Sequence, residues 1–337
     1  MLRPHDPIAG RSLRAVSELV SANSTYAELE NIMVTGVSID SHQIEAGDLF
    51  VAVAGAKTHG ATYAGNAKLN GAIAVLTDEV GAALVTDLPV LVVSNPRANA
   101  GVVSAWLHNE PMRDMFSVAV TGTNGKTTTA HLLAEILRTH GWKTEVIGTL
   151  TGTRTTPEST DLQRMLSAFE REGVEAVVME VTSHALELHR ATGTTFEAAV
   201  FTNLSQDHLD FHHTMEKYFA AKAKLFTKEF SACAIINRDD VHGQLLLDTM
   251  TIDAKSFGLS DISEVCMDAR HIEYEIEGVQ MRAQLGGQFN VMNSLAAVAA
   301  ARALGVPLPK IAEGLSRATA VPGRFESIDA GQHFGVI

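Results

Sequence analysis

Short runs of apolar residues alternate along the chain with longer stretches whose apolar residues recur every three or four positions. The short runs predict buried strands, and the longer stretches predict amphipathic helices. In the first third of the chain, strands are expected at residues 49–53, 72–76 and 89–93, with alanine-rich helices between them. This alternation is typical of a small α/β domain.

A second series of apolar runs begins at Phe116. Buried strands are expected at residues 116–120, 176–179, 198–201 and 232–236. Residues 127–139 predict a helix with an apolar face, and strand–helix–strand order implies a parallel sheet with right-handed crossovers. Further on, a hairpin is expected at 267–285, helices at 290–304 and 309–317, and the start of a strand at 334–337.

Length and composition define the broad class of protein. The chain has 337 residues, a length that indicates about two domains, and 46% of them are hydrophobic and 19% charged, a balance that indicates a globular protein. Together with the alternating pattern of strands and helices, this predicts an α/β protein. We expect an N-terminal domain at 1–110, a central domain at 111–320 and the start of a further domain at 321–337. The net charge of −13 argues against non-specific binding to nucleic acid or to an anionic membrane.

Cysteine use and hydropathy bear on the compartment. Cys233 and Cys266 form neither a CxxC motif nor a metal-ligand pattern, which favours a reduced cytoplasmic protein. No apolar stretch reaches about 18 residues, so no transmembrane helix is expected. The N-terminal residues lack the apolar core of a signal peptide.

The segment Thr121-Gly-Thr-Asn-Gly-Lys-Thr-Thr128 lies between a predicted strand and a predicted helix. Glycines allow backbone N–H groups to converge on phosphate oxygens at the positive end of a helix. Lys126 would offset phosphate charge, and the Thr127 hydroxyl would hold Mg²⁺. The strict pattern requires a glycine at position 120, where this chain has Val120. The context still favours nucleotide binding over an ordinary glycine turn.

A second candidate site combines a carboxylate, a histidine and a lysine. Glu180 follows one predicted strand and His208 follows the next, at the sheet edge where ligands bind in open α/β folds. Together they could hold a second divalent cation, although each alone would more often be a solvated strand end. Lys222 has mostly apolar neighbours, and composition alone favours a surface lysine whose stem packs on apolar groups.

The combined motifs resemble the Mur ligase family, and within it the MurE type, the UDP-N-acetylmuramoyl-tripeptide synthetases. The motifs that carry the resemblance are the phosphate loop, Thr155-Thr-Pro157, Met179-Glu-Val-Thr-Ser-His-Ala-Leu186, Phe201-Thr-Asn-Leu-Ser-Gln-Asp-His-Leu-Asp-Phe-His212, Ala220-Ala-Lys222, Phe289-Asn-Val-Met-Asn293 and Gly323-Arg-Phe-Glu326. Asp40-Ser41 and Gly47-Asp-Leu-Phe-Val-Ala52 resemble that family's UDP-binding domain.

The resemblance implies an ATP-dependent ligase of peptidoglycan and cell-wall synthesis. ATP would phosphorylate the carboxylate of UDP-N-acetylmuramoyl-L-alanyl-D-glutamate, and a diamino acid, meso-diaminopimelate or L-lysine, would attack the acyl phosphate. It also implies two Mg²⁺ sites and a lysine carbamylated by CO₂, Lys222. The protein is expected to act as a cytoplasmic monomer.

The resemblance assigns roles residue by residue. The catalytic residues would be Lys126, His208 and Lys222; the ATP-binding residues Gly122, Thr123, Asn124, Gly125, Lys126, Thr127, Thr128, Asn293 and Arg324; the substrate-binding residues Ser41, Thr155, Thr156, Ser183 and Arg190; and the metal ligands Thr127, Glu180 and His208. The chain departs from the family pattern at His42, Thr182, Leu188 and Gln288. None of these four departures removes a phosphate or metal group.

The family's third domain, which binds the incoming amino acid, should begin near Val321. The 337-residue chain is therefore expected to bind the UDP-linked precursor without forming the new amide. A folylpolyglutamate synthase-like ligase and a non-catalytic nucleotide- or precursor-binding protein remain as alternatives. A kinase or GTPase switch is disfavoured, because the chain has no Asn-Lys-x-Asp motif.

Overall fold

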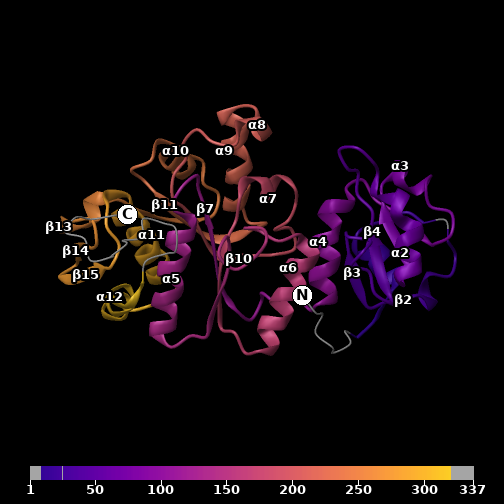
Figure 1. Cartoon of the computed structure of the whole chain (residues 1–337), viewed down its shortest axis with the longest axis horizontal. Helices are drawn as coiled ribbons and strands as arrows, with labels where there is room; N and C mark the ends of the chain where they lie inside the picture. The colour runs from indigo at the N-terminus through magenta and orange to yellow at the C-terminus, as the bar shows by residue number, and fades with distance from the viewer. Residues whose placement is uncertain (1–8, 25, 320–337) are drawn as a thin grey trace, which may run out of the picture. The chain divides into compact units, whose positions relative to one another are not determined.

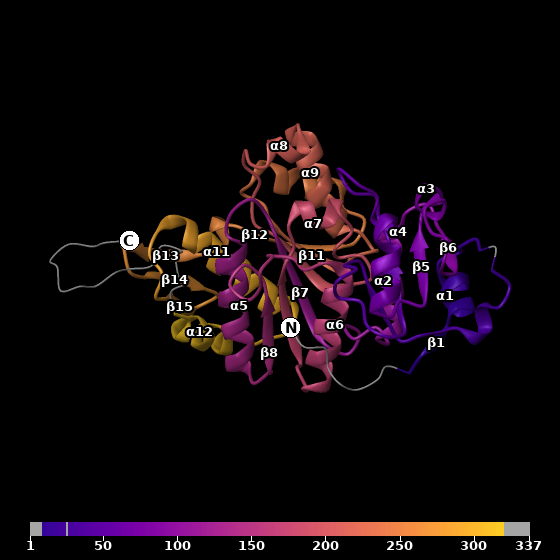
Figure 2. The ribbon, with the colours of Figure 1, turned by 45° about the vertical axis from the view of Figure 1, so that its right-hand side comes forward.

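The computed structural model describes residues 9–24 and 26–319. The chain divides into two compact units. Figures 1 and 2 show the ribbon coloured by residue number, from indigo at the N-terminus to yellow at the C-terminus. The first comprises residues 1–113, 157–169 and 187–194, and the second comprises the remaining segments. The expected third domain at 321–337 and the expected strand at 334–337 lie outside the described residues. No helix within the described residues is long and apolar enough to cross a membrane.

A four-stranded parallel sheet forms the centre of the first unit, in the order β3-β4-β5-β6. These strands are β3 (Gly36–Ser38), β4 (Asp48–Val51), β5 (Ala74–Thr77) and β6 (Val90–Val92). A small antiparallel pair, β1 (Arg11–Ser12) and β2 (Met33–Val34), accompanies it. The helical elements are α1 (Leu13–Leu19), η1 (Leu29–Asn31), η2 (Gly60–Tyr63), α2 (Ala64–Asn70), α3 (Glu79–Ala82), α4 (Pro96–Leu107) and most of α6 (Ser159–Arg171).

Alternate residues of each strand supply the cores on the two faces of this sheet. Leu49 and Leu76 pack with α1 and α4 on one face. Phe50 and Val75 pack with α2 on the other face. Both faces are therefore covered, and this explains why the strands are continuous apolar runs rather than alternating patterns.

The second unit is built on a six-stranded sheet in the order β12-β11-β10-β7-β9-β8, in which every pair is parallel. Its strands are β7 (Phe116–Thr121), β8 (Thr144–Ile147), β9 (Ala176–Glu180), β10 (Phe196–Phe201), β11 (Ser231–Asn237) and β12 (Asp253–Phe257). Strand β7 lies between β9 and β10, with Val118 opposite Val178 on one side and Ala198 on the other. The strand order reverses at β7, and open α/β sheets bind ligands at such a position.

Helices α5 (Lys126–His140), α11 (Gln288–Ala303) and α12 (Leu308–Arg317) pack together beside this sheet, as both ribbon views show. Leu132, Leu133, Ile136 and Leu137 of α5 are all buried there, as the periodicity predicts. The other helical elements of the unit are α7 (Ser183–Glu187), α8 (Leu209–His212), α9 (Met215–Ala223), η3 (Lys224–Phe226), α10 (Val241–Thr249) and η4 (Leu259–Asp261).

The expected hairpin at 267–285 is part of a three-stranded antiparallel sheet. Its strands are β13 (Ser263–Met267), β14 (Ile272–Ile276) and β15 (Val279–Ala283). Glu277 and Gly278 join β14 to β15 with φ angles of 51° and 79°, and two positive φ angles are the signature of a type I′ hairpin turn. The predicted α/β fold with parallel sheets is confirmed, and β13 is an addition to the predicted hairpin.

Candidate active site

The predicted phosphate loop lies directly between β7 and α5. Gly122 has φ 151°, and a Cβ there would lie 1.9 Å from Thr202 Oγ1. Gly125 has φ 87°, and a Cβ there would lie 2.2 Å from Asn293 Oδ1. Both positions thus require glycine. Val120, where the strict pattern has glycine, is instead a buried residue of β7, so the departure falls in the strand and leaves the loop unchanged.

The segment that follows β10 holds the loop in place. Asn203 accepts from the Asn124 N–H through its side chain (3.0 Å) and from the Thr123 N–H through its backbone carbonyl (2.9 Å). The Thr202 hydroxyl donates to the Asn124 carbonyl at 2.6 Å. These bonds fix the shape of the loop, while α5, which is 15 residues long, directs its N-terminus at it.

Two lysines converge on one carbonyl of this loop. Lys126 Nζ donates to the Gly122 carbonyl and to the Thr123 carbonyl, both at 2.9 Å. Lys222 Nζ donates to the same Gly122 carbonyl at 2.8 Å. Lys222 is only 1% exposed, so the composition-based interpretation of a surface lysine is wrong. Burial, reinforced by the nearby Lys126, holds the pKa of Lys222 well below its usual range, although Asp207 acts in the opposite direction.

Glu180 is a carboxylate that bonds to the first turn of α5. It is 1% exposed at the end of β9, and its Oε2 accepts from the Thr127 hydroxyl at 2.9 Å. Its Oε1 accepts from the Thr149 N–H at 2.8 Å. A carboxylate and a hydroxyl are hard oxygen ligands of the kind that Mg²⁺ prefers, so this pair fits the predicted metal role.

His208 belongs to a different cluster of side chains. It precedes α8 with φ 53°, and its Nε2 lies 3.4 Å from Asp207 Oδ2. Its ring lies edge-on to that of His184, with 4.8 Å between centroids. Across the described residues, no three His, Cys, Asp or Glu side chains gather into a metal-binding group. A cation here would need hydroxyl, water or phosphate oxygens as additional ligands.

Three of the predicted substrate residues lie beside Glu180 in the second unit. The Thr156 hydroxyl donates to the Glu180 carbonyl at 3.0 Å, and the Thr155 hydroxyl lies 3.1 Å from that of Thr149. Ser183 is buried, with its hydroxyl 2.9 Å from His212 Nε2. Its neighbour Thr182 is partly exposed and caps α7 by accepting from the Ala185 N–H. The role of Ser183 in binding the precursor stays a prediction.

The first unit contains the other two substrate candidates. Ser41 is buried, and its carbonyl accepts from Asn70 Nδ2 at 2.8 Å. Arg190 Nε lies 3.0 Å from Glu158 Oε1, and Arg97 Nη1 donates to Glu158 Oε2 at 2.8 Å. The sequence-based reasoning did not identify Glu158, although it directly follows the Thr-Thr-Pro motif. Its carboxylate orients both guanidinium groups.

Asn293 is buried on α11, where its amide donates to Asn290 Oδ1 at 3.0 Å and its Oδ1 faces Gly125. The side chain thus contacts the phosphate loop, a placement that the sequence alone did not predict. Thr128 is buried on the first turn of α5. Arg324, the remaining nucleotide candidate, lies outside the described residues.

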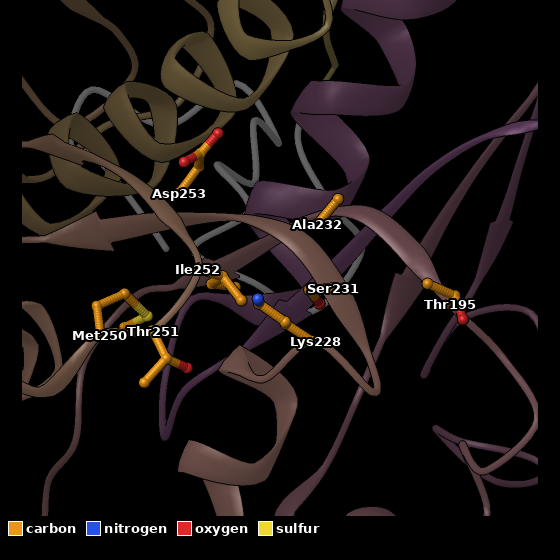
Figure 3. Close-up of a pocket in the computed structure, with 8 residues that line it drawn as sticks. All are labelled: Thr195, Lys228, Ser231, Ala232, Met250, Thr251, Ile252 and Asp253. Atoms are coloured by element: carbon orange, nitrogen blue, oxygen red, sulfur yellow. The ribbon is translucent and has the colours of Figure 1, made fainter.

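A cavity of about 550 Å³ lies elsewhere in the second unit (Figure 3). It is lined by Thr195, Lys228, Ser231, Ala232, Met250, Thr251, Ile252 and Asp253. Ser231 and Asp253 are the first residues of β11 and β12, so the cavity lies at the amino ends of these strands. The phosphate loop follows the carboxyl end of β7, and the cavity therefore plays no part in the candidate site.

The fold and the loop define a phosphate-binding α/β protein with a buried lysine at the loop. Family models narrow this class: residues 120–301 match the Mur ligase middle domain, and residues 33–116 match the Mur ligase family catalytic domain. The chain belongs to the Mur ligase family, and it is a ligase of that family.

Relatives and solved structures agree with this assignment. The UDP-N-acetylmuramoyl-L-alanyl-D-glutamate–2,6-diaminopimelate ligase of Streptomyces avermitilis is 39% identical over 346 residues, which cover 96% of this chain and 68% of the relative. A solved ligase of the same name matches with a TM-score of 0.82 and 29% identity, covering 95% of this chain and 69% of that one. An FPGS–AMPPCP complex matches with a TM-score of 0.52 and 16% identity over 66% of this chain and 68% of that one, which shows a shared fold alone.

Proposed function

We propose that this protein adds meso-diaminopimelate to UDP-N-acetylmuramoyl-L-alanyl-D-glutamate, with ATP as the energy source, in the cytoplasm. The observation that carries the proposal is the meeting of Lys126 and Lys222 at the Gly122 carbonyl of a phosphate loop. Relatives that match nearly the whole chain are named for this reaction. Their names also favour diaminopimelate over the L-lysine that the sequence analysis left open.

The chemistry has two steps. A carboxylate oxygen of the precursor attacks the γ-phosphorus of ATP, which forms an acyl phosphate and releases ADP. The neutral amine of the diamino acid then attacks the acyl carbon, and the tetrahedral intermediate collapses to an amide and inorganic phosphate. Both steps bring anions together, so positive charge at the phosphates lowers the barrier.

The loop and its neighbours supply that charge. Lys126 would leave its carbonyl partners for the transferred phosphate, and the backbone N–H groups of residues 123–127 would hold the other phosphates. Thr127 and Glu180 would hold Mg²⁺, which neutralises phosphate charge when bound. His208 would serve a second Mg²⁺ at the neighbouring strand end.

Lys222 is the proposed site of carbamylation. Its depressed pKa favours the neutral amine, whose lone pair can form an N–C bond to CO₂ with release of one proton to water. The product is an anion that can assist a metal site, which is the reason for a lysine at this position. Thr155, Thr156, Ser41, Arg190 and the Ser183 turn would hold the precursor.

The alternatives predict different ligands. A folylpolyglutamate synthase-like ligase would bind a folate, whereas the proposed ligase binds the UDP-linked dipeptide. A non-catalytic precursor-binding protein would bind the dipeptide without any need for Lys222. The Mur ligase match at residues 33–116 and the smaller overlap with the FPGS complex favour the proposed function.

Isothermal titration calorimetry tests the proposal. The chain should bind the UDP-linked dipeptide, and it should bind UDP-N-acetylglucosamine, which lacks the lactyl-peptide group, more weakly. Equal affinity for the two sugars, or affinity for a folate instead, would count against the proposed substrate. Mass spectrometry for the UDP-linked tripeptide, with ATP and meso-diaminopimelate supplied, then tests the proposed reaction itself.

A further inference from the structure

Tyr218 connects two parts of the site that lie far apart in sequence. It is 0% exposed on α9, one helical turn before Lys222. Its hydroxyl lies 3.1 Å from Thr123 Oγ1 of the phosphate loop. Its ring lies beside the lysine, with Lys222 Nζ 4.8 Å from the ring centroid.

The other hydrogen bonds of Thr123 leave room for its bond to Tyr218. Thr123 Oγ1 donates its single hydrogen to the Ser205 carbonyl at 3.2 Å and accepts from the Ser205 N–H at 3.0 Å. A hydroxyl has one donor and two acceptor sites, so these two bonds leave one lone pair of Thr123 Oγ1 that can accept from the Tyr218 hydroxyl. Burial raises the pKa of Tyr218, which keeps this phenol protonated and able to donate.

The ring acts on the lysine in a different way. Lys222 Nζ contacts both the ring of Tyr218 and the Gly122 carbonyl, and the lysine is only 1% exposed to water. Burial is the largest cause of the depressed pKa of Lys222. Removing the aromatic ring would allow water to reach the amine. Water solvates an ammonium group better than a neutral amine, so the protonated form would be favoured.

We propose that Tyr218 is a positioning residue with two separable tasks: its hydroxyl fixes Thr123 of the phosphate loop, and its ring keeps the Lys222 amine dry and directed at Gly122. This inference rests on the proposed function, since it concerns nucleotide binding and lysine carbamylation at the same site. The hydroxyl supports nucleotide binding through Thr123, and the ring supports carbamylation by keeping water away from the Lys222 amine. Substitutions that remove one group at a time therefore separate the two tasks.

Tyr218→Phe removes the hydroxyl alone. We expect its dissociation constant for ADP with Mg²⁺ to rise roughly five-fold, which is what the loss of one neutral hydrogen bond of about 1 kcal/mol predicts. Tyr274→Phe is the matched control, because Tyr274 is also buried and donates to Ser294 Oγ at 2.9 Å. Tyr274 and Ser294 belong to β14 and α11 and are not part of the phosphate loop.

Tyr218→Leu removes the ring as well. Carbon-13 NMR in labelled bicarbonate measures the carbamate, and Lys222→Arg identifies its signal. We expect Tyr218→Phe to keep the wild-type carbamate fraction and Tyr218→Leu to reduce it at least roughly two-fold, because hydration of the amine favours the ammonium form. Should Tyr218→Leu fail to fold, the Tyr218→Phe comparison still tests the hydroxyl.

The outcomes are distinct. Unchanged ADP affinity in Tyr218→Phe, with a loss of thermal stability equal to that of Tyr274→Phe, would show a structural role only and overturn the hydroxyl's task. An unchanged carbamate fraction in folded Tyr218→Leu would overturn the ring's task. If the wild-type chain neither bound ADP nor gave a carbamate signal, the proposed function itself would fall, and the inference with it.

Discussion

Replacement of Lys222 by methionine should stabilise the folded chain while removing a group needed for its chemistry. The lysine amine is buried, and its pKa is held well below the usual range by burial and by Lys126. At neutral pH the folded state must therefore either bury an ammonium group or release its proton. Methionine is a long, unbranched apolar side chain and imposes neither cost.

The contacts of Lys222 give the size of the effect. Methionine loses the bond to the Gly122 carbonyl, worth about 1 kcal/mol, but that oxygen still accepts from Lys126 and is not left without a donor. Replacing buried ionic groups by apolar ones of similar size typically stabilises proteins by about 1 to 4 kcal/mol. We expect a net gain of about 1 to 3 kcal/mol, because one hydrogen bond is lost.

The sign of the pH dependence follows from linkage. The pKa of Lys222 is lower in the folded than in the unfolded state, so the unfolded state binds more protons between the two values and wild-type stability rises with pH there. The destabilisation is fully present below the folded pKa and vanishes above the unfolded value of about 10.4. The advantage of Lys222→Met should therefore shrink as pH rises toward 10.

Urea unfolding in CO₂-free buffer at several pH values measures this difference. With m-values of about 2 to 3 kcal/mol/M, the urea midpoint should increase by about 0.3 to 1.5 M at neutral pH. Lys217→Met, an exposed position on the same helix, is the control and should change the midpoint little. A variant less stable than wild type, or an advantage independent of pH, would refute the reasoning and show that the ammonium is well solvated where it lies.

Three further predictions concern the phosphate loop and Glu180. Lys126→Ala should weaken the binding of a non-hydrolysable ATP analogue about 100-fold, since it removes about 3 kcal/mol of charge-assisted hydrogen bonding to the γ-phosphate, with an unchanged circular dichroism spectrum; calorimetry checks it, and an affinity within a few-fold of wild type would contradict it. Gly122→Ala should weaken ADP binding at least about 10-fold because its Cβ would overlap the Thr202 hydroxyl, whereas Gly173→Ala, at φ 72° with no atom within 4 Å, should leave the affinity unchanged. Glu180→Gln should remove most of the Mg²⁺ dependence of ADP binding but spare metal-free binding, as titrations with and without EDTA would show; an unaltered Mg²⁺ dependence would exclude Glu180 as a ligand.

Much of the fold could be predicted because the central strands are apolar on both faces. Val118 and Val178 lie inside the sheet, and continuous apolar runs mark such strands. The edge strands β8 and β12 could not be found in this way. In β12, four of five residues are exposed, so no apolar run marks it. An edge strand has a neighbouring strand on one side only, so its sequence can carry more polar residues than that of a central strand.

The residues of the phosphate loop could be predicted from the sequence, whereas most of the residues packed around the loop could not. The glycines, Lys126 and Thr127 are marked by local spacing between a strand and a helix. Lys222 looked like a surface residue because the partner of its buried amine, the Gly122 carbonyl, lies 100 residues away in the sequence. Only the resemblance to a family assigned Lys222 a role, and only the structure showed that Tyr218 contacts both Lys222 and the loop.

The supports of the phosphate loop have a consequence for biosynthesis. Thr123 is held by Ser205 and Tyr218, which follow it by 82 and 95 residues, and Gly122 is held by Lys222, which follows by 100. A ribosome that adds roughly 5 to 20 residues per second exposes the loop sequence about 5 to 20 s before Lys222 emerges. A nascent chain that pauses or is cut before Lys222 would thus carry the complete loop sequence without the contacts that shape it. Nucleotide binding should accordingly appear late in translation, and it should depend on residues that no inspection of the loop motif would reveal.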